Sequence, residues 1–320
     1  MSTTADGGGG DAMLERIEEE DLLAPGVPLV AMVSGGRDSI CLLDLTVRLL
    51  GAGPVTALHV NYGLRPGGSD EDEAHCAALC ERLGVALEVE RPARPEGPGN
   101  LQAWAREARY TAAARLAGEL GGASIATGHT ADDQVETILY RLASSPSRRA
   151  LLGMRPRDGR LVRPLLSLTR AETTAYCEQR GLAWRDDETN GGVRYARNRV
   201  RHGLMPALAQ IHPAAAANVL RTASLLRDEG EVLDALVGEQ IDERAGRLEI
   251  PLERLAALPA ALRRLVVQRL ADGAAGKLVP GAARHADEVA ALRRTGRAML
   301  DLGGGVRAVA ERGVLHAERG

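Results

Sequence analysis

The stretch VPLVAMVSGGRDS, residues 27–39, decides the fold. Its first seven residues are a short apolar run bounded by proline and glycine, which is typical of a buried parallel strand. The turn SGGRDS (34–39) follows, and residues 39–52 then have helical periodicity. Glycines in such a turn expose backbone N–H groups, and the start of a helix adds partial positive charge. The stretch therefore predicts a strand, an anion-binding turn and a helix.

The same alternation continues along the chain. Further strands are expected at 55–61, 85–91, 124–129 and 161–166, with helices at 70–84, 100–122, 132–143 and 168–181. Strands that alternate with helices of this length predict an α/β fold with a doubly wound parallel sheet. The pattern changes near Pro206. We therefore expect three parts: a flexible acidic N-terminal segment (1–22), an α/β catalytic domain (23–210), and a smaller, mainly helical domain (211–320) with strand-like pieces near its end.

Composition narrows the class of protein. The chain has 320 residues, 45% of them hydrophobic, which suffices for one large or two modest globular domains. No apolar run approaches the length of a membrane span, and the N-terminus lacks the features of a secretion signal. The four cysteines are Cys41, Cys76, Cys80 and Cys177, and none forms a CxxC pair. These features predict a cytoplasmic protein without a membrane partner.

Charge is distributed unevenly along the chain. The net charge is −3, but residues 141–201 contain 14 arginines and six acidic residues, a local net of +8 that leaves −11 for the remainder. Such asymmetry favours a polyanionic partner. A solvated arginine-rich face is an equally good interpretation of this feature alone.

The turn 34–39 has the composition of a polyphosphate site. The hydroxyls of Ser34 and Ser39 can donate hydrogen bonds to phosphate oxygens, and Asp38 beside a phosphate suggests a Mg²⁺ ion between them. The turn is neither a Walker A sequence nor GxGxxG. A Gly-Gly turn that only caps a helix remains the alternative. Its place at the end of the first strand favours a ligand, because ligands bind at the carboxyl ends of parallel strands.

SGGRDS resembles the SGGxDS pyrophosphate loop of the N-type ATP pyrophosphatases. Further motifs, in the same order over about residues 27–210, resemble the tRNA(Ile)-lysidine synthetase family. These motifs are His59–Arg65, Asn100 with Arg106, Arg109 and Tyr110, Thr127–Thr137, Gly153-Met154, Arg163–Leu166, Trp184–Asp187, and Arg197–Arg201 with Pro206. The C-terminal part matches only loosely and resembles the small tRNA-binding domain of the family.

The resemblance implies a PP-loop ATP pyrophosphatase domain and an enzyme that uses ATP and Mg²⁺. The expected reaction joins free L-lysine to C2 of the wobble cytidine of tRNA(Ile) with anticodon CAU, through an adenylated cytidine. The implied catalytic residues and Mg²⁺ ligands are Asp38 and Asp133. The implied ATP-binding residues are Ser34, Gly35, Gly36, Arg37, Asp38, Ser39, His59 and His129. Lysine binding is assigned to Asp132 and Glu136, and tRNA binding to Arg109, Arg148, Arg149, Arg197, Asn198 and Arg201.

The residues alone permit simpler interpretations. Asp132, Asp133 and Glu136 lie to one side of the apolar stripe of helix 132–143, and acids in a first helical turn often serve only the helix dipole. A single histidine after a strand, such as His129, is more often structural. Two departures from the family also stand out, Tyr62 in place of a second histidine and SSPSRR at 144–149 in place of a glycine-rich stretch.

Two other functions remain as alternatives. The same ATP chemistry serves another acceptor in thiolation or amidation, although thiolation enzymes of this superfamily use a CxxC that is missing here. A non-catalytic nucleotide- or RNA-binding relative is the second alternative, and the intact Asp38, Asp133 and Glu136 weigh against it. The sequence leaves a homodimer open.

Overall fold

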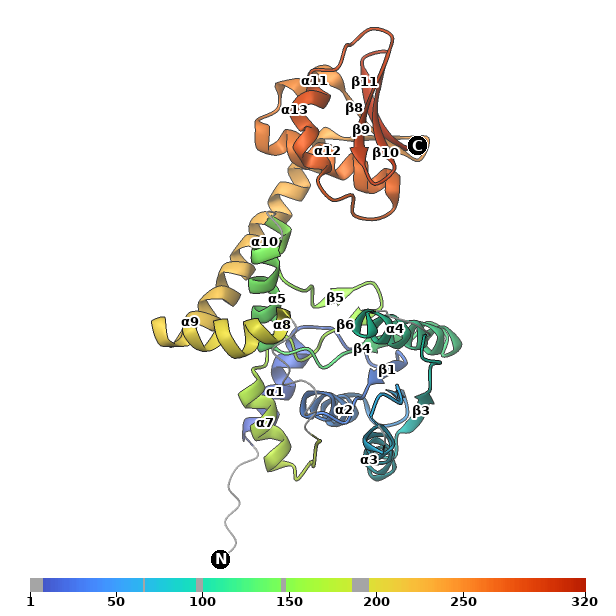
Figure 1. Cartoon of the computed structure of the whole chain (residues 1–320), viewed down its shortest axis with the longest axis vertical. Coiled ribbons are helices and arrows are strands. Elements are labelled where there is room, and N and C mark those ends of the chain that lie inside the picture. Colours follow the sequence, from blue (N-terminus) through green and yellow to red (C-terminus); the bar gives the residue numbers. More distant parts are fainter. Residues whose placement is uncertain (1–7, 66, 96–99, 145–147, 186–195) are drawn as a thin grey trace, which may run out of the picture. The chain divides into compact units, whose positions relative to one another are not determined.

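A computed structural model describes residues 8–65, 67–95, 100–144, 148–185 and 196–320 (Figure 1). The chain divides into two compact units, Met1–Ala223 and Ser224–Gly320, and the division falls inside the long helix α10 (Ala215–Gln240). The domain boundary expected after residue 210 stays a prediction.

A six-stranded sheet with the order β3-β2-β1-β4-β6-β5 forms the centre of the first unit. All neighbouring strands are parallel except the pair β5–β6, which is antiparallel. This arrangement confirms the predicted α/β fold with a parallel sheet. Chain order reverses between β1 and its neighbour β4, and such a reversal opens a crevice at the carboxyl ends of the strands. The strands are β1 (Leu29–Met32), β2 (Val55–Val60), β3 (Ala86–Glu90), β4 (Ser124–Ala126), β5 (Arg157–Asp158) and β6 (Leu161–Val162).

Helices cover both faces of this sheet. Leu29 and Ala31 of β1 point into a core shared with helices α1, α2, α3 and α7, whereas Val30 and Met32 point into a second core against α4. The alternation follows from the period of two in a strand. The helices of this unit are α1 (Gly8–Glu19), α2 (Arg37–Leu50), α3 (Gly68–Leu83), α4 (Leu101–Glu119), α5 (Ala131–Ser144), α6 (Arg148–Leu151), α7 (Arg170–Gln179), α8 (Ala196–Arg199), the π-helix η2 (Val200–Leu204) and α9 (Met205–Ile211).

The N-terminal segment contains a helix. The sequence of residues 1–22 predicts a flexible lead-in followed by a short acidic helix, and residues 8–19 form α1. Met13 and Ile17 are one helical turn apart on α1, and both are buried in the first core. Two apolar side chains at this spacing are enough to dock an otherwise acidic helix. Residues 1–7 lie outside the described residues.

The second unit packs helices on an antiparallel sheet of order β7-β8-β11-β10-β9. The sequence analysis expected a mainly helical domain, but this unit also contains a five-stranded sheet. The strand-like pieces at the end of the chain are confirmed as strands, but the β7–β8 hairpin was missed. Its turn is Ala245-Gly246, with positive φ angles of 52° and 73°, as a two-residue hairpin requires. The elements after α10 are β7 (Asp242–Arg244), β8 (Arg247–Pro251), α11 (Leu252–Ala257), α12 (Ala260–Ala275), the 3-10 helix η3 (Ala282–His285), α13 (Ala286–Ala290), β9 (Arg297–Gly303), β10 (Val306–Glu311) and β11 (Val314–Arg319).

Within the described ranges, no helix combines the length and the apolar character that crossing a membrane requires.

Candidate active site

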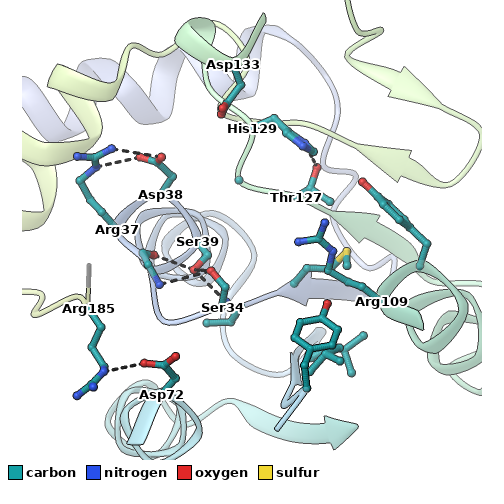
Figure 2. Close-up of a pocket in the computed structure, with 18 of the residues that line it drawn as sticks. Ser34, Arg37, Asp38, Ser39, Asp72, Arg109, Thr127, His129, Asp133 and Arg185 are labelled. Atoms are coloured by element: carbon teal, nitrogen blue, oxygen red, sulfur yellow. Dashed lines mark hydrogen bonds and ion pairs between the residues drawn. The ribbon is translucent and has the colours of Figure 1, made fainter. Parts of the chain in front are cut away.

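A cavity of about 460 Å³ lies in the first unit at the carboxyl ends of β1, β2 and β4 (Figure 2). Its lining comes from the turn after β1, from β2, from α4, from the β4–α5 connection and from the start of α7. The crevice expected at the strand reversal is therefore present, and it contains the motifs that the sequence analysis selected.

The turn after β1 is held by its own serines. The Ser39 hydroxyl donates to the carbonyl of Gly36 over 2.8 Å and accepts from the amide of Ser34 over 3.1 Å. Gly35 has a φ of +83°, which glycine adopts without strain. Helix α2 starts with Gly36 as its N-cap, so no side chain caps its first amides. Uncapped amides at a helix start are donors for an anion.

Asp38 is held from two sides. Arg37 contacts its carboxylate with two nitrogens, at 3.0 and 3.3 Å, and the Thr173 hydroxyl of α7 donates to it over 2.6 Å. Figure 2 shows the Arg37–Asp38 pair at the rim of the cavity. The carboxylate is thus oriented by both a sequence neighbour and a distant helix.

Gly128 brings β4 against the start of α2. A Cβ atom at this position would lie 2.8 Å from the carbonyl oxygen of Asp38 and 3.1 Å from the amide of Ser39. Real Cβ atoms do not approach backbone this closely, so only glycine fits. This contact sets the spacing between the anion-binding turn and the residues that follow β4.

The residues after β4 place two acids near the cavity. Asp133 accepts hydrogen bonds from the amide and hydroxyl of Thr130, at 2.9 and 3.1 Å. Burial opposes its ionisation, but the Thr130 amide and the Arg170 guanidinium outweigh that effect and lower the pKa of Asp133. Glu136, one turn later, is only 3% exposed, and burial raises its pKa. The two carboxylates therefore differ in proton affinity although they share one helix.

His129 lies beside these acids. Its Nδ1 is 2.8 Å from the Thr127 hydroxyl, and burial lowers the pKa of His129 to about 4. The imidazole is therefore neutral at physiological pH. A neutral ring can pair with a base or a hydroxyl, whereas it adds no positive charge toward a phosphate.

Arg170, at the start of α7, joins the acids and was missed by the sequence analysis. Its guanidinium lies 3.3 Å from Asp133, 3.4 Å from Glu136 and 3.9 Å from Asp38. Its backbone amide donates to Asp132 over 2.7 Å. One signal was available in the sequence. Thr169 and Glu172 form a capping box, which places a helix start directly after the last strand, at the same edge of the sheet.

Arg185 is a second missed residue. It lines the cavity and contacts Asp72 of α3 over 2.7 Å, while its amide donates to the carbonyl of Gly35 over 3.0 Å. A segment far along the chain thus supports the turn after β1.

The structure brings most predicted residues to the cavity. Those that line it are Ser34, Gly36, Arg37, Asp38, Ser39, Arg109, His129, Asp133 and Arg201. The others lie outside the lining. His59 is buried below the turn, with Nδ1 2.9 Å from the carbonyl of Val33. Asp132 caps α7, and Glu136 lies behind Arg170 and Arg201.

The residues predicted to bind RNA lie in different places. Arg197 donates to Thr137 over 2.8 Å and lies 3.8 Å from Glu136, and Arg201 lies 3.6 Å from Glu136. Arg148 and Asn198 belong to the short helices α6 and α8 and do not line the cavity. The side chain of Arg149 and residues Asp186 and Asp187 of the motif lie outside the described residues.

Three helices begin at this cavity. The first turns of α2, α5 and α7 contribute Arg37, Asp133 and Arg170 to its lining. Each helix start carries partial positive charge, and each first turn also carries an acid. The arrangement suits a ligand that is strongly anionic in one part and cationic in another.

Comparison with known proteins agrees with this geometry. Residues 16–208, more than half of the chain, match the family model described as a PP-loop domain. A tRNA(Ile)-lysidine synthase of Gloeobacter violaceus is 38% identical over 259 residues, which cover 78% of each chain. The chain belongs to the tRNA(Ile)-lysidine synthase family. Another tRNA(Ile)-lysidine synthase, from Geobacter sulfurreducens, is 35% identical over 301 residues and covers 87% of this chain.

The chain is shorter than several relatives, and its fold is similar to that of a solved structure. This member of the lysidine synthase family spans 63% of the length of the Geobacter relative, less than two thirds. Among solved structures, the U34-tRNA thiolase NcsA from Methanococcus maripaludis with its [4Fe-4S] cluster superposes with a TM-score of 0.55, at 17% identity, over 68% of this chain and 78% of that one. This likeness concerns the fold alone.

Proposed function

We propose that this protein joins free L-lysine to C2 of the wobble cytidine of tRNA(Ile) with anticodon CAU, using ATP and releasing AMP and pyrophosphate. The observation that carries the proposal is the meeting, in one cavity, of an uncapped helix start with carboxylates that arginines hold in place. Membership of the tRNA(Ile)-lysidine synthase family supports the same reaction. Such a tRNA-modifying reaction belongs in the cytoplasm.

ATP fits the half of the cavity next to β1 and β2. Met32, Leu58 and Val60 give that half an apolar wall, with Tyr62 beside it. A purine suits such a wall, and its triphosphate then reaches the amides at the start of α2 and the hydroxyls of Ser34 and Ser39. These donors stabilise the charge that develops on the departing pyrophosphate.

The donor set fits a magnesium ion that arrives with the nucleotide. Asp38 and Asp133 both face Arg170, and the described residues contain no group of three metal-ligating side chains. Mg²⁺ commonly uses one or two carboxylates together with substrate phosphates. Asp38 and Asp133 would hold it, and it would neutralise charge on the phosphates.

The proposed chemistry has two steps. First, O2 of the cytidine attacks the α-phosphorus of ATP and pyrophosphate leaves. Second, the amine of lysine attacks C2 of the activated base, loses a proton, and AMP leaves. Glu136 is suited to bind the ammonium group of lysine and to take a proton from it. Its raised pKa makes it a stronger proton acceptor than an exposed carboxylate. For this contact, lysine takes the place that Arg170 or Arg201 holds beside Glu136.

Pyrophosphate release with one component omitted at a time tests the proposal. The expected result is continued release only when ATP, lysine and the tRNA are all present, together with a lysine-dependent mass gain of the tRNA. Without lysine, release should stop after at most one pyrophosphate per tRNA, because the adenylated cytidine is not resolved. Release with another nucleophile in place of lysine would identify a different acceptor. Thiolation is disfavoured because all four cysteines are buried and none lines the cavity. No release under any condition would leave only nucleotide or RNA binding.

A further inference from the structure

Four arginines near the cavity, of which Arg109 lines it, form no ion pair with an acid among the described residues. Arg106 and Arg109 belong to α4, Arg141 to α5, and Arg163 follows β6. In the part of the chain that the structure describes, none of these four forms an ion pair with a carboxylate, whereas Arg37, Arg170 and Arg185 around the same cavity all do. We refer to the four as the arginine cluster.

Neutral groups hold the arginine cluster in place. Arg141 donates to the carbonyl of Gly153 over 2.6 Å, and Arg163 donates to the carbonyl of Arg155. The guanidinium carbons of Arg106 and Arg109 lie 4.7 and 5.7 Å from the centre of the Tyr110 ring. These contacts fix geometry but leave the positive charge uncompensated.

The charges of the arginine cluster act on one another. Burial lowers the pKa of Arg163, which is only 6% exposed. Tyr110 and Asp158 raise this pKa, and the charges of Arg106 and Arg141 lower it. Burial likewise lowers the pKa of Arg141, with Arg197 and Arg106 adding to the effect. Arg163 is the buried member of the arginine cluster, and Arg109 and Arg141 are partly buried. Like charges held together in a partly buried region oppose folding, and Asp158 offsets only part of them, so an anionic ligand would stabilise the cluster.

Three buried polar atoms in this region also lack a hydrogen-bond partner within the described segments of the chain. They are the Nε of Arg109, the Nε of Arg163 and the hydroxyl of Tyr110. Buried polar groups in native proteins are rarely left unsatisfied, and a group of them points to a ligand. Figure 2 shows the Arg109 side chain pointing into the cavity toward Thr127 and His129, so a ligand in the cavity can reach it.

We propose that the arginine cluster, together with the Tyr110 hydroxyl, binds a backbone phosphodiester of the RNA next to the reacting base. The proposal rests on the proposed function and assigns Arg106, Arg141, Arg163 and Tyr110 to the RNA side of the site.

Position favours RNA over the nucleotide as the source of the phosphate. The uncapped amides for the ATP phosphates lie after β1, and the apolar wall for its base lies toward β2. Arg141 and Arg163 are attached to the opposite side, around β4 and β6, and Arg106 is exposed to solvent. A cluster that extends from a cavity to the surface suits a continuous polyanion, and phosphate contacts of this kind orient RNA without reading its sequence.

Equilibrium binding of a synthetic RNA hairpin with CAU in a seven-nucleotide loop tests the proposal. The variants are Arg106→Ala/Arg141→Ala and Tyr110→Phe, with Arg82→Ala on the exposed end of α3 as the control for loss of a surface charge. The double variant should weaken RNA binding about tenfold and reduce the slope of log Kd against log salt by up to about 1.4, since each of the two lost single-strand phosphate contacts removes about 0.7. Arg82→Ala should change neither, and the Kd for MgATP should be the same in all proteins.

Tyr110→Phe separates ligand binding from structure. Its hydroxyl has no hydrogen-bond partner among the described residues, so removing it should leave the melting temperature equal or higher while RNA affinity falls a fewfold. Unchanged RNA affinity and salt slope in both variants would overturn the proposal. So would a loss of MgATP binding with RNA binding preserved. If the wild-type protein forms lysidine and the variants bind RNA normally, only this inference fails. If the cluster governs RNA binding but no lysidine forms, the proposed function fails instead.

Discussion

The turn after β1 and the start of α5 carry the two halves of the candidate site, and they are built differently. Contacts within the turn join residues at most five positions apart, such as Ser34 with Ser39 and Arg37 with Asp38. Glu136 of α5, in contrast, faces arginines 34 and 65 positions later in the chain, Arg170 and Arg201. The shape of the anion-binding turn is therefore set mainly by local contacts, with further support from Thr173 and Arg185. The acidic half takes its neutralising charges from distant residues and is complete only once the domain has folded.

The acidic half offers the largest expected effect. Asp133→Asn keeps the shape of the side chain but removes the charge that Arg170 and the Thr130 amide stabilise. Lysine incorporation into tRNA, measured as mass gain, should fall by about 100- to 1,000-fold, the range for losing a preorganised charged group. Glu178→Gln is the control, because Glu178 is an exposed carboxylate of α7 outside the assigned site, and it should retain most activity. Equal losses in both variants would contradict the role of Asp133.

The second largest effect is expected at Gly128, where β4 packs against the start of α2. Gly128→Ala places a Cβ 2.8 Å from the carbonyl of Asp38 and should push α2 away from β4. We expect ATP affinity, measured by calorimetry, to fall at least about tenfold, because overpacking of this kind costs about 1–3 kcal/mol. Gly53→Ala has no atom within 4 Å of its new Cβ and serves as the control. Normal ATP binding by Gly128→Ala would show that the turn works without its distant support.

The pH dependence of stability tests burial in the acidic half. The pKa of His129 is lowered from 6.5 to about 4, so the unfolded state takes up a proton before the folded state does as pH falls. Stability is therefore unaffected above about pH 6.5 and is lost between pH 6.5 and pH 4. Linkage gives a loss of about 2 kcal/mol at pH 5 relative to pH 8. Urea unfolding of the wild type and of His129→Gln measures it, and the variant should show a shallower decrease. Identical pH profiles would contradict the buried neutral imidazole.

The smallest expected effect concerns the hydroxyl of α7 that donates to Asp38. Thr173→Val removes the hydroxyl that donates to Asp38 over 2.6 Å. The KM for ATP should rise about three- to tenfold, as expected for one hydrogen bond to a charged group. Thr174→Val is the control, since the Thr174 hydroxyl donates only to the carbonyl of Arg170 in its own helix. An unchanged KM would mean that Arg37 alone orients Asp38.

The same contrast explains what the sequence could predict. The five parallel strands, the helices between them and the turn 34–39 follow from local periodicity and glycine placement, and the structure contains all of them. Arg170 and Arg185 could not be assigned in this way, because their partners lie tens of residues away and depend on how helices pack. Asp132 and Asp133 show the limit most clearly. They are adjacent and chemically identical, yet one caps a neighbouring helix and the other lines the cavity.

The second unit shows a different limit. The β7–β8 hairpin has a two-residue turn of Ala245-Gly246, and alanine at a positive φ is not a strong turn signal. Helix α1 has two buried core residues, Met13 and Ile17, and its other residues are largely acidic. Its sequence therefore gives little indication that it packs on the first core. In both cases the tertiary environment decides a structure for which local preference is weak.

The convergence of three helix starts on one cavity also bears on turnover. The partial charges that attract a triphosphate do not disappear when the α–β bond breaks, so the diphosphate product remains in a favourable field. Product dissociation is then a natural slow step, and added pyrophosphate should compete with ATP more strongly than orthophosphate does.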